Sequence, residues 1–270
     1  FHDLSFLHHP DFFSVRQKLW HWLQDYARAA GRAAHLIAVS EFTKSDIVNF
    51  LKIPAEKISV IYSGLGDDLR PLPADDPALA DFTKKHSLNF PFILHLGTIE
   101  PRKNIPALIR AFNILKTKPA NRDLRLVLAG APGWLYQNTL REATTSPAGD
   151  HIIFFGSVAP KERLFLYNKC IAFAYPSFFE GFGFPPLEAQ KCGAPVIASD
   201  RTSIPEILGN SALFVNPWRP DELAEKLSFL LENKSERANL RELGLANAAK
   251  FSWDAAARQT LNLLEKYAGK

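Results

Sequence analysis

Phe178-Phe179-Glu180-Gly181-Phe182-Gly183-Phe184-Pro185-Pro186-Leu187-Glu188-Ala189 is the stretch that decides the fold, because it predicts a glycine-rich loop running directly into a helix. Pro185 and Pro186 suit the first turn of a helix, since their rings fix φ near the helical value and they carry no N–H group. Gly181 and Gly183 can adopt positive φ and allow a ligand to approach the backbone closely. We therefore expect a ligand at the beginning of this helix.

The chemistry of this helix start favours a phosphate group flanked by hydroxyls. The first amides of a helix lack intrahelical acceptors, and the macrodipole makes that end positive, so phosphate binds there readily. Two carboxylates bracket the place: Glu180 on the loop and Glu188 about one turn into the helix. A carboxylate beside a phosphate needs a neutral partner, and the hydroxyls of a sugar or ribose supply one. The stretch therefore predicts a site for a nucleotide-sugar.

From Phe92 onward, short apolar runs alternate with amphipathic segments. The expected strands cover residues 92–97, 124–129, 151–155, 170–175, 195–199 and 212–215. The expected helices cover residues 105–115, 160–168 and 220–250, and a further helix follows Trp134. Six strands alternating with helices indicate a Rossmann-like, doubly wound α/β domain, whose ligands bind beyond the carboxyl ends of the strands. Gly97, Gly130, Gly156 and the 176–184 loop all follow such ends.

The first 70 residues predict a smaller α/β unit. Residues 14–33 have a helical pattern, whose apolar face consists of Leu19, Trp22, Leu23, Tyr26 and Ala30. A strand at 35–40, a helix to Leu51 and a strand at 58–62 follow, which is typical of a parallel sheet. Ser40 is the expected N-cap of that helix, with Thr43 and Ser45 as alternatives. Residues 65–77, rich in proline and acidic residues, predict a linker.

Three segments carry a resemblance to a known family. Glu180 and Glu188, with seven residues between them, resemble the paired glutamates of retaining glycosyltransferases of family 4, which have the GT-B fold. Upstream, Gly97-Thr98-Ile99-Glu100-Pro101-Arg102-Lys103-Asn104 resembles the diphosphate-binding segment of that family. The start of the chain, His2-Asp3-Leu4 with His9-Pro10, is similar to a segment in the N-terminal domain of mannosyltransferase-like members.

The resemblance implies an α/β protein of GT-B type, with two Rossmann-like domains of which the first is incomplete. We expect residues 1–70 to be the remaining part of the N-terminal, acceptor-side domain and residues 71–90 to be the linker. Residues 91–251 would form the nucleotide-sugar-binding domain, and residues 252–270 a helix crossing back to the first domain. The chain has no Met and opens within a motif, so we expect a fragment that lacks an N-terminal portion.

The resemblance also implies the roles of particular residues. Arg102 and Lys103 would stabilise the diphosphate without a metal, since a guanidinium and an ammonium are strong phosphate partners. Glu180 would lie near the hydroxyls of the donor sugar and Glu188 near those of the ribose. His2 would reach the donor across the interdomain cleft. The expected catalytic set is therefore Glu180, His2, Arg102 and Lys103. The expected donor-binding set is Gly97, Arg102, Lys103, Val158, Leu164, Glu180, Gly181, Phe182, Gly183 and Glu188.

For several of these residues a plainer structural role is an alternative. Val158 and Leu164 are as well explained by core packing as by lining a base pocket. Glu188 could be a helix-surface carboxylate favoured by the dipole, and Arg102 with Lys103 an exposed basic turn. A dinucleotide fingerprint is incomplete, because Pro186 stands where a third glycine would follow Gly181 and Gly183.

The resemblance implies transfer of a hexose, with mannose from GDP-mannose as the expected donor, to a saccharide or lipid-linked saccharide acceptor. Retention at the anomeric carbon, no metal and no cofactor beyond a GDP- or UDP-linked donor are expected with it. Three alternatives remain: a UDP-sugar transferase or epimerase, a nucleotide-binding fragment without turnover, and a dehydrogenase.

The composition limits the kinds of binding partner and the cellular compartment that we expect. A hydrophobic content of 47%, 22% charged residues and a net charge of +4 are ordinary for a globular protein. The basic residues are scattered, so we expect no nucleic-acid partner and a solvated surface, with peripheral attraction to anionic lipid as the alternative. The sequence contains no run of eighteen apolar residues, so we expect no transmembrane helix. Cys170 and Cys192 predict no disulfide framework, so we expect a cytoplasmic protein, with the inner face of the membrane as its alternative place.

Overall fold

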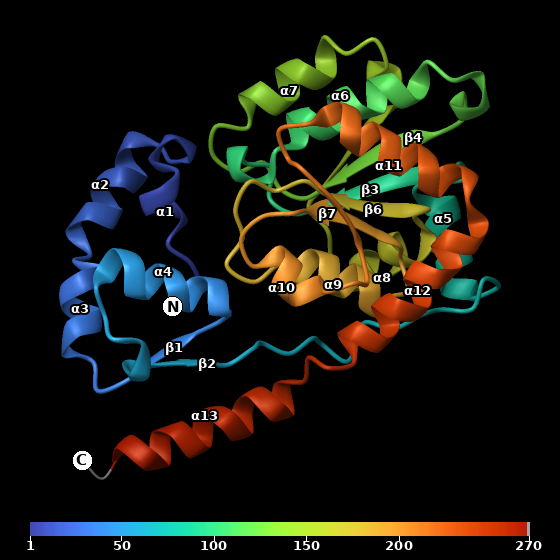
Figure 1. The fold of residues 1–270 in the computed structure, drawn as a ribbon. Helices are drawn as coiled ribbons and strands as arrows, with labels where there is room; N and C mark the ends of the chain where they lie inside the picture. Colours follow the sequence, from blue (N-terminus) through green and yellow to red (C-terminus); the bar gives the residue numbers. More distant parts are fainter. Residues whose placement is uncertain (269–270) are drawn as a thin grey trace.

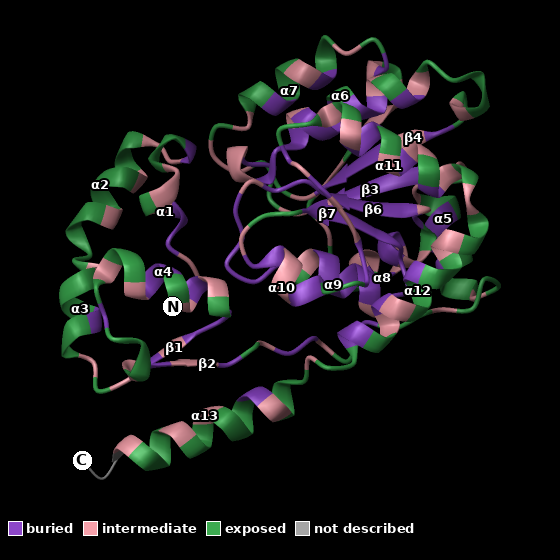
Figure 2. Ribbon diagram, in the orientation of Figure 1, coloured by how far each residue is buried: buried purple, intermediate pink, exposed green. Residues whose placement is uncertain are grey.

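The computed structural model describes residues 1–268 and contains two parallel sheets, each in its own unit (Figure 1). The first unit is built on a two-stranded sheet and the second on a six-stranded sheet. Buried residues gather in the strands of the larger sheet and in the helix faces against it, whereas α2, α3 and α13 are largely exposed (Figure 2). The larger unit therefore holds most of the core.

The first unit pairs β1 with β2 in parallel, with Leu36 opposite Ile58. Its elements are α1 (Ser5–His8), a 3-10 turn η1 (Pro10–Phe12), α2 (Val15–Leu23), α3 (Tyr26–Arg32), β1 (Leu36–Ala38), α4 (Glu41–Leu51), η2 (Ala55–Lys57) and β2 (Ile58–Val60). Ser40 is the N-cap of α4, and its hydroxyl accepts a hydrogen bond from the Thr43 amide at 3.0 Å, as the sequence predicts. A small cluster of buried apolar side chains joins α4 to both strands.

The second unit follows the doubly wound pattern expected from the sequence. Its strands are β3 (Phe92–Leu96), β4 (Arg125–Ala129), β5 (Ile152–Gly156), β6 (Ala172–Tyr175), β7 (Val196–Ser199) and β8 (Leu213–Val215). Its helices are α5 (Pro77–Lys85), α6 (Ile105–Lys116), α7 (Gln137–Thr144), α8 (Pro160–Lys169), α9 (Phe184–Lys191), α10 (Ile204–Leu208), α11 (Pro220–Glu232) and α12 (Lys234–Ala248). Short 3-10 turns complete it: η3 (Pro101–Lys103), η4 (Pro119–Asn121) and η5 (Gly149–His151).

The order of the strands, β5-β4-β3-β6-β7-β8, fixes where a ligand can bind. The chain starts in the middle at β3, winds outward to β5, and then returns to β6 on the other side of β3. Helices α6, α7 and α11 cover one face of the sheet, while α5, α8 and α9 cover the other (Figure 1). The carboxyl ends of β3 and β6 therefore form the topological switch point, which is the usual place for a ligand in such sheets.

Two segments of chain cross between the units at the same place. The residues after β2 lead into the second unit, and α13 (Trp253–Ala268) returns from α12 to the first (Figure 1). The Leu65 amide donates to the Phe251 carbonyl at 3.3 Å, and a Cβ on Gly64 would lie 2.1 Å from the Trp253 amide nitrogen. Near the far end of α13, the rings of His35 and Tyr267 stack at 4.6 Å. Residues 269 and 270 of the expected C-terminal helix lie outside the described residues.

The single helix expected over residues 14–33 is wrong. Asp25 adopts a left-handed conformation with φ of 44°, and its side chain accepts from the Arg28 amide at 3.2 Å, so it caps α3 and separates it from α2. The expected apolar face is not buried as a whole either, since Trp22 is 77% and Leu23 64% exposed. In the part of the chain that the structure describes, no helix combines the length and apolarity required to cross a bilayer.

Candidate active site at the switch point of the sheet

The candidate site is assembled by two loops that leave neighbouring strands at the switch point. The loop after β3 contains Gly97 and the turn η3, which carries Arg102 and Lys103. The loop after β6 carries Glu180 and leads into α9, where Glu188 lies. The Phe178 amide donates to the Arg102 carbonyl at 2.9 Å, so the backbones of the two loops are joined directly. Arg102, Lys103 and Glu180 thus lie on two adjoining loops.

Glu180 is the centre of a buried hydrogen-bonded cluster. Its Oε1 accepts from Lys103 Nζ at 2.7 Å and from the Tyr175 hydroxyl at 2.9 Å. Its Oε2 accepts from Arg102 Nη1 at 2.8 Å. The Lys103 ammonium also donates to the Tyr175 hydroxyl at 2.6 Å. A carboxylate offers about four lone-pair positions, and these contacts use three of them, so one position on Oε2 is not used by these contacts.

The cluster keeps Glu180 ionised. Burial by itself would raise the pKa of this carboxyl, but the charges of Arg102 and Lys103 outweigh burial and lower the pKa to about 2. Arg102 is held further by Glu100, whose Oε1 accepts from Nε at 3.1 Å and lies 2.8 Å from Nη2. The positive charges of Arg102 and Lys103 thus balance the negative charges of the Glu100 and Glu180 carboxylates. The exposed-turn alternative for Arg102 and Lys103 is wrong, since Lys103 is buried and only 18% of the Arg102 side chain is exposed.

Glu188 has its own pair of partners on α8. Its Oε1 accepts from Arg163 Nη1 at 2.7 Å, and its Oε2 accepts from the Tyr167 hydroxyl at 3.0 Å. Burial raises the pKa of Glu188, and the Arg163 charge partly offsets that shift. The surface-carboxylate alternative is therefore wrong, because Glu188 is buried. Each of its oxygens keeps an acceptor position beyond the contacts made here, which suits the two adjacent hydroxyls of a ribose.

The glycines of the loop serve two different purposes. A Cβ on Gly181 would lie 1.8 Å from the carbonyl oxygen of His2, so the backbone of the first unit approaches the loop here. This contact accounts for the glycine at position 181, and close approach of a ligand to its amide stays a prediction. Gly183 adopts a φ of 100°, which side-chain-bearing residues rarely adopt, and it forms the N-cap of α9.

The remaining predicted residues lie around this centre. The His2 side chain is exposed, while its backbone touches Gly181. Phe182 is buried and packs at 4.9 Å from the Phe184 ring. Leu164 belongs to the core between the sheet and α8, and Val158 packs partly buried against the same core, so core packing accounts for both.

Sequence reasoning missed the residues that join the two units beside the site. Glu206 of α10 accepts from the Glu41 and Phe42 amides at 2.7 and 3.0 Å, and from the Tyr62 hydroxyl at 2.9 Å. A carboxylate is favourable there, because α4 begins at Glu41 and its first amides are unpaired. Ser40 donates to the Gly181 carbonyl at 2.7 Å. Tyr175, Glu100, Arg163 and Tyr167 were also missed, because their partners are distant in sequence or carry no motif.

The site could hold an anion or hydroxyl groups more readily than a metal ion. Among residues 1–268, no group of three or more His, Cys, Asp or Glu side chains has the arrangement of a metal site. Metal-independent binding stays a prediction. Fixed charges, a helix N-terminus and open carboxylate positions are what the geometry offers.

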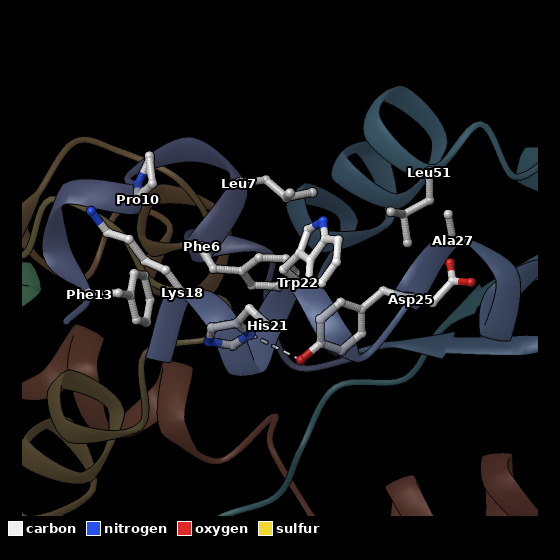
Figure 3. Close-up of a pocket in the computed structure, with 11 residues that line it drawn as sticks. Phe6, Leu7, Pro10, Phe13, Lys18, His21, Trp22, Asp25, Ala27 and Leu51 are labelled. Carbon is white, nitrogen blue, oxygen red and sulfur yellow. Dashed lines mark hydrogen bonds between the residues drawn. The ribbon is translucent and has the colours of Figure 1, made fainter. Parts of the chain in front are cut away.

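A mainly apolar cavity of about 360 Å³ lies elsewhere, in the first unit (Figure 3). Figure 3 shows Phe6, Trp22 and Leu51 around it, with His21 Nδ1 bonded to the Tyr26 hydroxyl at 3.0 Å. No residue predicted for the nucleotide-sugar site lines this cavity. Its convergent polar groups are few, so it is not the candidate active site.

Comparison with known proteins gives two family matches that together span most of the chain. Residues 80–245 match the model described as Glycosyl transferases group 1. Residues 1–69 match the model described as Glycosyltransferase Family 4.

Several curated relatives are named mannosyltransferases. The chain is 30% identical over 263 residues to O-antigen chain mannosyltransferase B of Escherichia coli, which covers 97% of this chain and 68% of that protein. It is 31% identical over 218 residues to O-antigen chain mannosyltransferase RfbU of Salmonella typhimurium, covering 80% of this chain and 55% of that protein. A serotype-specific mannosyltransferase WbdA of Escherichia coli is matched over only 27% of its length. The chain thus spans parts of longer relatives.

Solved structures show the same fold at low sequence identity. HepE of Anabaena in complex with UDP-glucose has a TM-score of 0.80 at 21% identity, covering 95% of this chain and 69% of that one. WaaG, a glycosyltransferase involved in lipopolysaccharide biosynthesis, has a TM-score of 0.72 at 16% identity, covering 84% of this chain and 61% of that one.

Proposed function

This chain belongs to the Glycosyl transferases group 1 family and has the GT-B fold of family 4 glycosyltransferases. We therefore propose that it transfers a hexose from a nucleotide-sugar to a saccharide acceptor. The family and the GT-B fold expected from the sequence are both confirmed. The observation that supports the proposed activity most is the convergence of Arg102, Lys103, Glu180 and the start of α9 at the switch point of the sheet.

In the proposed mode of binding, the donor lies with its diphosphate between Arg102 and the start of α9. Arg102 is the better exposed of the two cations, with 18% of its side chain accessible against 8% for Lys103. The free acceptor position on Glu180 would take a hydroxyl of the sugar, and Glu188 the hydroxyls of the ribose. The exposed side chain of His2 would reach the donor sugar from the first unit.

The proposed chemistry is departure of the nucleoside diphosphate with retention at the anomeric carbon. The bond from the anomeric carbon to the diphosphate oxygen breaks while the acceptor oxygen bonds to the same face. The leaving phosphate takes the acceptor proton. Arg102, Lys103 and the 181–183 amides stabilise the charge that develops on the diphosphate. Glu180 contributes by holding both cations in place, because its carboxylate stays ionised.

We propose mannose as the transferred sugar, because the curated relatives quoted above are named mannosyltransferases. We propose GDP as its carrier, because GDP-mannose is the donor that the family resemblance implies. A UDP-sugar is the second candidate, favoured by the likeness to HepE, whose structure contains UDP-glucose. An epimerase, or a nucleotide-binding chain without turnover, would share the same donor site. Measurement of product separates these from a transferase.

Thermal unfolding of the chain with GDP, UDP, ADP and NAD in parallel tests the proposal. A nucleotide that binds only the folded state stabilises it by about 2.7 kcal/mol at 100 times its Kd. The double variant Arg102→Ala/Lys103→Ala should lose affinity for GDP but keep its weak affinity for guanosine, because only GDP carries the charge that these residues meet. Equal GDP affinity in both proteins would remove them from the site. Addition of EDTA should leave GDP binding unchanged.

We also propose that α2 attaches the protein to the inner face of a membrane that carries a lipid-linked acceptor. Trp20 and Trp22 are 54% and 77% exposed, and Arg16 and Lys18 lie on the same helix. Tryptophan suits the interface of a bilayer, and basic residues favour anionic lipid. Vesicles of anionic lipid should bind the parent chain, and the double variant Trp20→Ser/Trp22→Ser should bind them more weakly. Equal binding would contradict this attachment.

A further inference from the structure

Successive peptide groups of the loop after β6 are fixed by side chains from distant parts of the chain. The Phe179 carbonyl accepts from Arg102 Nη1 at 3.1 Å. The Glu180 amide, which belongs to the same peptide group, donates to Thr202 Oγ1 at 3.1 Å. The Glu180 carbonyl accepts from Ser203 Oγ at 2.9 Å. The main chain on both sides of Glu180 is therefore held from the loop after β7 as well as from η3.

The next carbonyl along the chain, that of Gly181, is fixed by the first unit. Ser40 Oγ donates to it at 2.7 Å and Thr43 Oγ1 at 3.3 Å. In a planar trans peptide group the carbonyl and the N–H point in opposite directions. The N–H of Gly181 therefore points away from Ser203, and the N–H of Phe182 points away from Ser40.

The two amides that are oriented in this way keep their capacity to donate. Within the part of the chain that the structure describes, neither the Gly181 amide nor the Phe182 amide donates to a protein acceptor. Both residues are buried, and an amide without an acceptor is unfavourable in a buried position. These N–H groups therefore favour a ligand that accepts hydrogen bonds, and the oxygens of a diphosphate do so.

Ser203 does not make the contact that its position in the chain suggests. It is the N-cap residue of α10, where a serine hydroxyl usually accepts from an amide of the first turn. In α10, which lies within the described residues, no such side-chain bond forms. The fully buried hydroxyl donates to the Glu180 carbonyl instead. Local helix capping therefore does not account for this serine.

Thr202 is strained and is tied to the same loop. Its φ of 57° is exceptional for a β-branched residue, and such strain persists only where the surrounding contacts impose it. Its hydroxyl accepts from the Glu180 amide and donates to the Arg201 carbonyl at 2.8 Å, so the direction of the hydroxyl is fixed. The strained conformation thus holds an acceptor against the Glu180 amide.

We propose that Ser203 and Thr202 are positioning residues for the donor site. Their hydroxyls fix the main chain at Glu180, and the amides of Gly181 and Phe182 are thereby turned toward the diphosphate. Both residues act through the loop and not by contact with the donor. The inference rests on the proposed transferase function, and it adds the loop after β7 to the two loops that assemble the site.

Calorimetric titration of the full chain with GDP and with UDP, each compared with its own nucleoside, tests the inference. Ser203→Ala removes the hydroxyl that holds the Glu180 carbonyl. Thr202→Val removes the hydroxyl that holds the Glu180 amide and keeps the β-branched shape. Each variant should bind the diphosphate about tenfold more weakly, because hydrogen bonds to a charged group are lost from good alignment. Each should bind the nucleoside as the parent does, since the oriented amides meet only the diphosphate.

Two matched variants separate positioning from folding. Thr202→Ser keeps the hydroxyl and should bind as the parent does. Ser199→Ala removes a buried hydroxyl at the end of β7 that has no partner among the described residues, so it should also bind normally. A ¹H–¹⁵N spectrum of each protein shows whether it is folded. In the parent, inorganic pyrophosphate should shift the amide signals of Gly181 and Phe182, and these shifts should be smaller in Ser203→Ala.

The outcomes separate the inference from the proposed function. Selective loss of diphosphate affinity in Ser203→Ala and Thr202→Val, with both matched variants unaffected, supports the positioning role. Parent-like affinity in either hydroxyl variant, or an equal loss in a matched variant, overturns it. An equal loss of diphosphate and nucleoside affinity also overturns it, because it would show a structural role only. The same holds if pyrophosphate leaves the Gly181 and Phe182 signals unmoved in a parent that binds GDP or UDP. A parent that binds no nucleotide would overturn the proposed function and the inference with it.

Discussion

Replacing Glu180 with glutamine should destabilise the protein by about 3 kcal/mol at neutral pH. The carboxyl has a pKa lowered from 4.5 to about 2 in the folded protein, mainly by Arg102 and Lys103 acting against burial. A difference of roughly 2.5 units at about 1.36 kcal/mol per unit gives about 3 kcal/mol. Removing one partner of a buried ion pair costs about 3–5 kcal/mol, which is consistent with this value.

The dependence on pH distinguishes this effect from a simple loss of packing. A carboxyl whose folded pKa is depressed contributes stability that is fully present above its unfolded pKa. That stability is lost as the pH falls from about 4.5 toward about 2. The glutamine variant lacks the titrating group, so the difference between parent and variant should shrink over this range.

Urea unfolding followed by tryptophan fluorescence, at several pH values from 7 downward, measures both quantities. The control is Glu142→Gln, which breaks a pair with Arg110 whose side chain is 54% exposed. Exposed pairs contribute about 0.2–1 kcal/mol, so the control should change stability little. The reasoning is refuted if Glu180→Gln costs no more than the control, or if its effect is the same at pH 3 as at pH 7.

Three further predictions concern the contacts between the units and the lower stability of the first unit. Gly181→Ala places a Cβ 1.8 Å from the His2 carbonyl oxygen, so it should push the units apart and enlarge the radius of gyration in small-angle X-ray scattering; an unchanged radius would contradict this. Glu206→Gln removes the charge that accepts from Tyr62, whose pKa is raised to about 12, by burial first and by Glu206 next. Ultraviolet titration should therefore show the pKa of Tyr62 falling toward 10, and no shift would disprove the contact. Amide exchange should be faster in β1 and β2 than in β3 and β4, because the first unit has the smaller core; equal rates would count against this.

The positions of the strands along the chain were predictable because the sequence signals of a strand are local. A buried parallel strand is a mainly apolar run that ends at a glycine or a polar loop, and β3 and β4 fit that description. β5 is apolar as well, although it is only partly buried at the edge of the sheet. The N-cap Ser40 was predictable for the same reason, since its partner is three residues away. The loop and helix at 178–189 carried enough of a motif to locate the site.

The pairing inside the site could not be predicted, because periodicity says nothing about contacts between distant residues. Lys103 and Glu180 are separated by 77 positions, and only the adjacency of β3 and β6 brings them together. The break at Asp25 left a signal that was overlooked. Asp25 is an N-capping residue type that tolerates left-handed φ, and it stands three positions before Arg28, whose amide it accepts from.

The crossing of the two inter-unit segments restricts how the units can turn. A single flexible tether would leave three independent rotations, but here two tethers are bonded to each other where Leu65 meets Phe251. Bending of one unit against the other would turn near this point, and it would also have to break the hydrogen bond from Ser40 to the Gly181 carbonyl. Displacement grows with distance from the crossing, so α1, which Figure 1 shows farther from the crossing than β2, travels farther for the same angle. The gap made by such bending would be narrowest beside Leu65 and Phe251 and wider toward α1.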